Sequence, residues 1–198
     1  MAVQSIPESL EAREAALKQR LAQYDTLVVA YSGGVDSTYL MDVAHEVLGN
    51  HALAVLMDSA SIPRQEVRDA AALAKERGWR FSVLATHEFD CAAFRRNDAQ
   101  RCYHCKTARL RELAAFAKAH DCTALAHGEN AQDSLDATRV GVHAAAEQGA
   151  EAPLAEVGLS KDDVRHLSRR RALPTWDKAS FACLATRIPT GTPISPEA

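Results

Sequence analysis

Short apolar runs alternate with longer amphipathic segments along most of the chain. The runs have the length and the Val, Leu and Ala content of buried strands, and they occupy residues 27–31, 52–57, 80–85 and 123–127. The segments between them place apolar residues at helical spacing and occupy residues 9–24, 38–48, 62–78 and 107–120. Strands that alternate with helices in this way form parallel sheets. The pattern predicts a single α/β domain over residues 1–198, with a parallel sheet flanked by helices on both faces.

Local signals mark the ends of several of these helices. Ser61 is placed to cap the helix that has Pro63 in its first turn, and Gly78 is placed to end it. Residues 160–163 read Ser-Lys-Asp-Asp, a capping box that predicts a further helix over residues 164–171, ended by Pro174. These signals support the helical interpretation of the amphipathic segments.

The loop after the first predicted strand reads Ser-Gly-Gly-Val-Asp-Ser. Glycines let the backbone approach a ligand closely, and the free N–H groups of such a turn and of the helix behind it favour an anion. The serines add hydroxyl donors, and the aspartate adds a carboxylate suited to Mg²⁺. We therefore predict that this loop binds the phosphates of a nucleotide, together with Mg²⁺, through Ser32, Gly33, Gly34, Asp36 and Ser37.

This loop matches the pattern S-G-G-x-D-S at every fixed position. It is not a Walker A loop, because no lysine lies near it. It resembles the PP-loop of the ATP pyrophosphatase superfamily. That resemblance implies cleavage between the α- and β-phosphates, transfer of AMP to a substrate oxygen and release of pyrophosphate. The alternative is a polar glycine turn that merely closes an ordinary strand–helix unit.

Length, charge and cysteine content narrow the class of protein further. A chain of 198 residues fits one domain with a sizeable core, and the net charge of −3 counts against a broad nucleic-acid-binding surface. No apolar stretch approaches the length of a membrane span, and residues 8–14 are acidic, unlike the start of a signal peptide. We therefore expect a cytoplasmic protein with no membrane partner, in which the five cysteines are not disulfide-bonded.

Two cysteines form a C-x-x-C pair, Cys102 and Cys105, flanked by Arg101 and Lys106. This spacing brings two thiolates within reach of one metal ion or cluster, and basic neighbours favour the thiolate form. The chain has no second C-x-x-C pair, so Cys183 is the nearest candidate for a third ligand. The remaining cysteines are interpreted as small core residues, namely Cys91 and Cys122.

Three sequence features together point to one family. They are the C-x-x-C pair with its basic flanks, the Gly-Glu-Asn-Ala-Gln-Asp turn at residues 128–133, and residues 176–189, which contain Trp-Asp-Lys and Cys-Leu-Ala-Thr-Arg-Ile-Pro. Over essentially the whole chain they resemble the LarE-type ATP-dependent sulfur transferases. The resemblance implies adenylylation of a carboxylate of pyridinium-3,5-biscarboxylic acid mononucleotide and then sulfur transfer, for the nickel cofactor of lactate racemase. It also implies a small-molecule partner rather than nucleic acid, and a homo-oligomer.

Members of that family deliver sulfur in different ways, and this chain resembles those with three cysteines. On that basis Cys102, Cys105 and Cys183 would hold a 4Fe-4S cluster whose remaining iron binds sulfide. The alternatives are a sacrificial Cys183 that gives up its own sulfur, a zinc site, or a persulfide carrier. The predicted catalytic residues are Cys183, Asp36 and Arg187, with the arginine as a clamp for a phosphate or carboxylate.

Ligands of open parallel sheets bind outside the carboxyl ends of the strands. Met57 ends the second predicted strand and is predicted to contact adenine through its backbone, the alternative being a plain loop. Gly128 ends the fourth strand and is predicted to leave room for adenosine, the alternative being a simple turn. Lys178 would bind the same anion as Arg187 or lie in solvent.

The turn after the fourth strand carries further candidates. Asp133 and Asp136 would bind Mg²⁺ or merely face water, and Arg139 lies in a pattern that resembles the family's substrate loop. The chain also departs from the family: Thr190 stands where a tyrosine is usual, and Ala179 stands where a proline is usual.

The family usually has a longer C-terminal region, and residues 195–197 (Ser-Pro-Glu) have the pattern of a helix start. We therefore expect residues 174–198 to lead into a further region of the natural protein. Two other functions stay open: a PP-loop tRNA thiolase, which the acidic net charge counts against, and a non-catalytic module that senses ATP or redox state.

Overall fold

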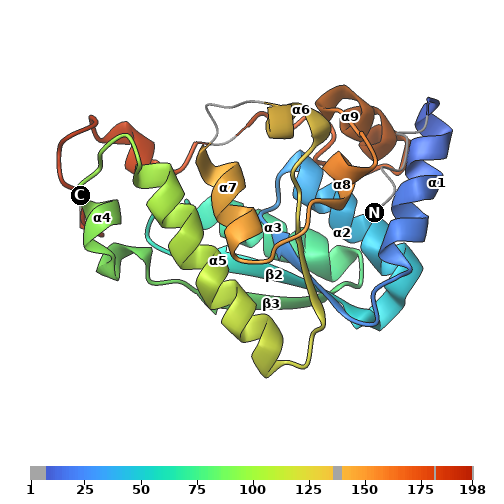
Figure 1. Ribbon diagram of the computed structural model, residues 1–198, viewed down its shortest axis with the longest axis horizontal. Coiled ribbons are helices and arrows are strands. Elements are labelled where there is room, and N and C mark those ends of the chain that lie inside the picture. Colours follow the sequence, from blue (N-terminus) through green and yellow to red (C-terminus); the bar gives the residue numbers. More distant parts are fainter. Residues whose placement is uncertain (1–7, 136–139, 181, 198) are drawn as a thin grey trace.

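A computed structural model describes residues 8–135, 140–180 and 182–197, and within these ranges the strands form a four-stranded sheet (Figure 1). The strands are β1 (Leu27–Tyr31), β2 (Ala52–Asp58), β3 (Arg80–Ala85) and β4 (Ala124–His127), in the spatial order β3-β2-β1-β4. Every pair is parallel, and Val29 lies opposite both Ala54 and Ala126. The predicted parallel α/β sheet is confirmed.

The longer helices connect and cover these strands. They are α1 (Leu10–Leu21), α2 (Val35–Leu48), α3 (Arg64–Glu76), α5 (Arg101–Ala119) and α9 (Lys161–Arg170). The shorter α-helices are α4 (Ala92–Arg95), α6 (Ala131–Leu135), α7 (Val140–Glu147) and α8 (Pro153–Glu156). The described ranges also contain 3₁₀ turns at Gly49–His51, Glu88–Asp90 and Leu184–Arg187. Within the described ranges, no helix is both long enough and apolar enough to cross a membrane.

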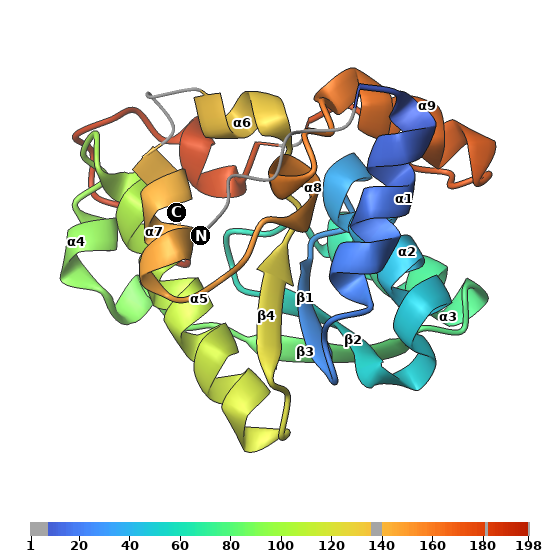
Figure 2. The same ribbon diagram turned by 45° about the vertical axis from the view of Figure 1, so that its right-hand side comes forward.

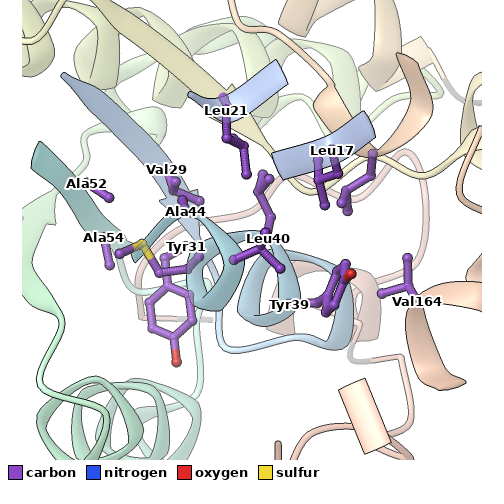
Figure 3. Packing of buried hydrophobic residues seen from close by; sticks show 14 of the residues in the cluster. Leu17, Leu21, Val29, Tyr31, Tyr39, Leu40, Ala44, Ala52, Ala54 and Val164 are labelled. Atoms are coloured by element: carbon purple, nitrogen blue, oxygen red, sulfur yellow. The ribbon is translucent and has the colours of Figure 1, made fainter. Parts of the chain in front are cut away.

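One face of the sheet packs against α1, α2, α3 and α9. Alternate residues of β1, such as Val29 and Tyr31, point into this core, where Leu17 and Leu40 meet them from the helices (Figure 3). Because successive strand side chains point to opposite faces, Val28 and Ala30 enter the second core instead. That core includes Leu110, Leu113 and Ala117 of α5 together with Ala145 of α7. Figure 2 shows α1, α2 and α3 on one side of the sheet and α5 and α7 on the other, so the expected two-faced covering is confirmed.

The strand order creates a switch point at the carboxyl end of β1. From β1 the chain passes to β2 and β3 on one side, and it then returns to place β4 on the other side of β1. Connections that leave in opposite directions open a crevice between neighbouring strand ends, where ligands of such sheets bind. The Ser32–Ser37 loop follows β1 and Gly128 follows β4, so the fold brings both to this crevice.

Several predicted helix ends are wrong in detail. Helix α5 begins at Arg101 rather than near residue 107, so the C-x-x-C pair lies in its first turns. Helix α2 likewise begins at Val35, before residue 38. Ser61 does not cap α3: the cap position is Pro63, which makes no side-chain capping bond. The Ser61 hydroxyl instead donates to Glu88 at 3.0 Å, a long-range partner that no local pattern reveals.

Candidate functional site

The loop after β1 has a conformation that only glycine accommodates at one position. Gly33 has φ of +71°, and a Cβ added there would lie 2.9 Å from the Cβ of Ala70 on α3. Both the left-handed backbone and the close approach therefore exclude a larger residue. Gly34, by contrast, is the extended N-cap of α2, and a Cβ there would meet only the Ser32 hydroxyl at 3.4 Å. The second glycine is therefore not required by the fold.

The two serines of the loop bind each other rather than a distant partner. Ser32 Oγ lies 2.9 Å from Ser37 Oγ, and the Ser32 N–H donates to Ser37 Oγ at 3.1 Å. The Gly34 N–H makes a long 3.4 Å bond to Ser32 Oγ. These contacts close the loop over the start of α2, where the first N–H groups of a helix lack intrahelical acceptors. The loop therefore presents donors and the positive end of a helix dipole to one place.

Two lysines from distant parts of the chain reach this place. A cavity of about 260 Å³ beside the loop is lined by Asp36, Glu66, Lys161 and Lys178, among others. Lys161 Nζ lies 2.5 Å from Asp36 Oδ2, and Lys178 Nζ donates to Glu66 Oε2 at 2.7 Å and to the Gly33 carbonyl at 3.1 Å. Sequence reasoning missed Lys161, because the capping box shows only that a helix starts there. Two ammonium groups over a helix N-terminus suit a polyphosphate.

One carboxylate oxygen of Asp36 accepts no hydrogen bond from the described residues. Its Oδ2 is engaged by Lys161, whereas its buried Oδ1 has no hydrogen-bond partner among the described residues. Unpartnered buried acceptors are rare because they forfeit the hydration that they had in water. A carboxylate oxygen is a preferred ligand of Mg²⁺, which is bound by one or two carboxylates together with substrate phosphates. The residue therefore fits the role of metal ligand that the sequence predicts for it.

The structure gives a packing reason for glycine at position 128, which differs from the predicted room for adenosine. A Cβ added there would lie 2.5 Å from Ser37 N and 2.8 Å from Ser37 Cα. The end of β4 thus packs directly on the first turn of α2, and the space beside Gly128 is filled by main chain. A contact with adenosine stays a prediction, but packing alone requires glycine here.

A second cavity, of about 310 Å³, lies beside the first. We call the first the phosphate cavity and this larger, apolar one the cysteine cavity. Its walls are mainly apolar and include the ends of β1 and β2, His127 at the end of β4, and the face of α5 that carries Cys102 and Cys105. Cys183, Ser32 and Ile62 line both cavities. The three predicted sulfur ligands and the phosphate loop are therefore parts of one continuous region.

The segment that carries Cys183 is tied to the sheet through a buried carboxylate. Glu88 is fully buried and accepts hydrogen bonds from Ser59, Ser61 and Thr86 at 2.5, 3.0 and 2.9 Å. The Ser61 carbonyl in turn accepts the N–H of Leu184 at 2.9 Å. This chain of contacts holds the residue after Cys183 against the loop that follows β2.

The three cysteines have different environments. Cys102 is exposed, with Arg101 Nη2 at 3.9 Å from its sulfur, whereas Cys105 and Cys183 are partly buried. Burial raises the pKa of the Cys105 thiol to about 12, although the positive charge of Arg109 acts against this rise. Among the described residues, no three His, Cys, Asp or Glu side chains are arranged to hold a metal ion. The cysteines thus share a cavity without forming a ligand set in this arrangement.

Met57 and His127 complete the wall of the second cavity. The Met57 carbonyl accepts a hydrogen bond from Arg109 Nη2 at 2.5 Å, and its predicted contact with adenine stays a prediction. Burial, helped by the charge of Lys106, lowers the pKa of His127 to about 4. His127 Nε2 lies 3.6 Å from Glu129 Oε2. Because the imidazole is neutral near pH 7, that contact is not an ion pair.

Other predicted residues lie elsewhere. Arg187 is exposed and lines a separate cavity of about 280 Å³ with Phe89 and Ile194, so the structure does not bring it to the phosphate loop. Its role as an anion clamp stays a prediction. Asp133 accepts a hydrogen bond from the Asn130 amide at 2.7 Å. Asp136 and Arg139 lie outside the described residues.

Comparisons with known proteins agree with this geometry. A family model described as NAD synthase matches residues 9–182. The chain is 38% identical over 188 residues to an uncharacterised protein of Synechocystis, covering 95% of this chain and 70% of that protein. It is 29% identical over 188 residues to pyridinium-3,5-bisthiocarboxylic acid mononucleotide synthase of Lactiplantibacillus plantarum, covering 94% and 68%. The structure of NMN synthetase from Francisella tularensis superposes with a TM-score of 0.68 at 19% identity, over 88% of this chain and 76% of that one.

Proposed function

Because this chain belongs to the NAD synthase family and is therefore an ATP-using enzyme of the PP-loop type, we propose that it is a LarE-type sulfur transferase of the cytoplasm. The proposed substrate is pyridinium-3,5-biscarboxylic acid mononucleotide, in the synthesis of a nickel-pincer cofactor. The similarity to a synthase of the bisthiocarboxylic acid mononucleotide supports this substrate. The single observation that carries the proposal is that Cys183 lines both the phosphate cavity and the apolar cavity.

In the first proposed step, a substrate carboxylate oxygen attacks the α-phosphorus of ATP. The bond from that phosphorus to the bridging oxygen breaks, and pyrophosphate leaves with the electron pair. The loop amides and the ammonium groups of Lys161 and Lys178 are arranged to stabilise the charge that develops on the leaving group. Asp36 would hold Mg²⁺, which supplies further charge neutralisation when it is bound.

In the second step, a sulfur nucleophile attacks the activated carbonyl carbon. A C–S bond forms, the C–O bond to AMP breaks, and AMP leaves with the electron pair. The mainly apolar walls of the larger cavity would exclude water, which otherwise competes with sulfur for the acyl adenylate. The proposal thus gives each cavity one half of the reaction.

The source of the sulfur is the finer part of the proposal. Cys102, Cys105 and Cys183 are the residues that would hold a 4Fe-4S cluster, and a bound cluster would supply an iron site for an added sulfide. Their thiols would have to converge on binding it, because the described side chains form no three-ligand group. The same cavity also accommodates the alternative in which Cys183 gives up its own sulfur.

Iron and acid-labile sulfide measured on anaerobically purified protein test the cluster. We expect stoichiometric iron and sulfide, and their loss when Cys102, Cys105 or Cys183 is replaced by alanine. Cys91→Ala and Cys122→Ala are the matched controls, because neither residue lines the cysteine cavity. A protein that contains zinc and no iron would contradict the cluster while leaving the nucleotide site in place.

Pyrophosphate release tests the function itself. We expect release that depends on ATP, Mg²⁺ and the pyridinium dicarboxylate, followed by thiocarboxylate formation when a sulfur source is present. No release with this acid or related acids would contradict the proposal and favour an ATP sensor. Tight binding of bulk tRNA at physiological salt would favour a tRNA thiolase instead.

A further inference from the structure

Helix α9 reaches the phosphate loop in a second, indirect way through Arg165. Arg165 Nη1 donates to the Trp176 carbonyl at 2.9 Å, and its Nη2 donates to the Lys178 carbonyl at 3.0 Å. The planar fork of a guanidinium matches two acceptors at a fixed separation, which a lysine does not. Arg165 therefore fixes the main chain of residues 176–178 on α9.

Helix α9, which carries Arg165, is held in place by its capping box and by buried side chains. Ser160 and Asp163 form the capping box at its start, and Asp163 also binds Arg13 at 2.6 Å. Val164 and Leu167, on either side of Arg165 in the sequence, are fully buried in the main core. The guanidinium is thus carried by an element that packing and capping both hold in place.

The segment that Arg165 holds carries Lys178, which acts directly on the loop. Lys178 Nζ binds the Gly33 carbonyl at 3.1 Å and Glu66 Oε2 at 2.7 Å. In a trans peptide the C=O and the following N–H point in opposite directions. Holding the Gly33 carbonyl therefore keeps the Gly34 N–H turned the other way, toward Ser32 Oγ at 3.4 Å.

We propose that Arg165 is a positioning residue of the nucleotide site, which holds Lys178 against Gly33 and so keeps the loop in its anion-binding form. This inference rests on the proposed ATP function. Within the described part of the chain, Arg165 lines neither cavity and donates its hydrogen bonds to main-chain carbonyls. Its influence on a bound nucleotide must therefore pass through residues 176–178.

A double-mutant cycle on Mg·ATP affinity, measured by calorimetry, tests this path. The variants are Arg165→Gln, Lys178→Met and the two combined. We expect each single change to raise the Kd roughly tenfold, and the double variant to bind no worse than Lys178→Met alone, because the two residues act in series. A double variant weakened by the product of the single effects would overturn the proposal.

Two further variants separate positioning from charge and from folding. Arg165→Lys keeps the charge but not the two-carbonyl fork, so it should weaken binding as much as Arg165→Gln; full rescue by lysine would overturn the proposal. Arg170→Gln is the matched control, since Arg170 lies on the same helix and its ion pair within the described ranges is with exposed Glu11, at 3.7 Å. It should leave the Kd unchanged.

Wild-type protein that binds no ATP would overturn the proposed function and this inference together. Wild-type binding with unaltered binding by Arg165→Gln would overturn the inference alone. Urea unfolding of each variant shows whether a weakened Kd reflects the nucleotide site or the fold.

Discussion

The phosphate end and the cysteine end of this site are neighbours, yet they are built differently. The phosphate loop is six consecutive residues, Ser32–Ser37, and it adjoins the largest hydrophobic core among the described residues. The cysteines come from the start of α5 and from the segment before Leu184–Arg187. Of these, Cys105 and Cys183 pack against a small cluster whose buried members are Phe94, Ala185 and Ile194. A local motif on a large core needs few long-range contacts to keep its shape, whereas the cysteine cavity depends on contacts between distant segments.

The charges of the two ends differ as well. The lysines of the phosphate cavity are paired with carboxylates, Lys161 with Asp36 and Lys178 with Glu66. In the cysteine cavity, Arg101 and Arg109 donate instead to neutral amide and carbonyl oxygens of described residues. When a nucleotide binds, these lysines can exchange their carboxylate partners for phosphates, and the carboxylate of Asp36 can take Mg²⁺ in place of its lysine. The comparison therefore assigns ion exchange to one end and chemistry in an apolar medium to the other.

The largest effect should come from breaking the ionic end at Asp36. Asp36→Asn keeps the shape of the side chain but removes the charge that Mg²⁺ and Lys161 both use. We expect the rate of Mg²⁺-dependent pyrophosphate release to fall by roughly 10³, at the upper end of the effect of removing one electrostatic group. Asp69→Asn is the control and should be neutral, because Asp69 is exposed on α3 and, among the described residues, accepts a hydrogen bond from the neighbouring Gln65. A variant that keeps more than a tenth of the activity would refute the metal-ligand role.

The strand, turn and helix that carry the phosphate loop can be predicted from the sequence for a physical reason, whereas phosphate binding by its residues stays a prediction. A strand, a glycine turn and a helix N-terminus are encoded within some twenty consecutive residues, so the geometry follows from local rules. Lys161 escapes such reasoning because only the packing of α9 against α2 brings it to Asp36. Likewise, the sequence places Cys183 in a motif but cannot show that Ser61 and Glu88 hold its segment in place.

The ends of a helix are harder to predict from sequence where residues distant along the chain fix them. The start of α5 at Arg101 is fixed by tertiary contacts of Arg101 with Asn97 and Ala185 rather than by a capping residue, since Gln100 makes no side-chain capping bond. The short helices α4, α6, α7 and α8 carry too few residues to show a clear period. The sequence shows Gly128 at the end of the fourth strand but cannot show its contact with Ser37, which comes from tertiary packing, and its contact with adenosine stays a prediction.

The next largest effect should come from replacing glycines, and it separates a glycine required by packing from one proposed to contact the nucleotide. Gly128→Ala forces a Cβ to within 2.5 Å of Ser37 N, so backbone must move, and we expect a loss of about 3 kcal/mol in the free energy of unfolding. Gly34→Ala meets no atom closer than 3.4 Å and should unfold like wild type in urea while binding ATP more weakly. Equal stability of the two variants would contradict the packing role of Gly128.

A smaller effect should reveal the apolar character of the cysteine cavity. Because the pKa of Cys105 is raised to about 12, its thiolate is scarce at pH 8. After correction for the higher nucleophilicity of a more basic thiolate, we expect Cys105 in metal-free protein to react with iodoacetamide about 30-fold more slowly than an ordinary thiol. Exposed Cys102 is the internal reference, and both residues should react alike in urea. Equal rates in the folded protein would show that the cavity is wet.

The smallest effect is a change in stability with pH that arises from His127, which lines the cysteine cavity at the end of β4. Its pKa of about 4 lies below the ordinary value of about 6.5, so between these values the unfolded chain binds a proton that the folded chain does not. Stability therefore rises with pH across this window and is lost as the pH falls from about 6.5 toward 4. Between pH 7.5 and pH 5 the imidazole should account for a loss of about 1 to 2 kcal/mol, which His127→Asn should remove. Urea midpoints of both proteins at the two pH values measure the difference.

His51→Asn is the control, because that histidine is exposed at the opposite end of the sheet, before β2. If wild type and His127→Asn lost stability in parallel, the imidazole would be hydrated, and the contrast between an ionic and an apolar half of the site would not hold.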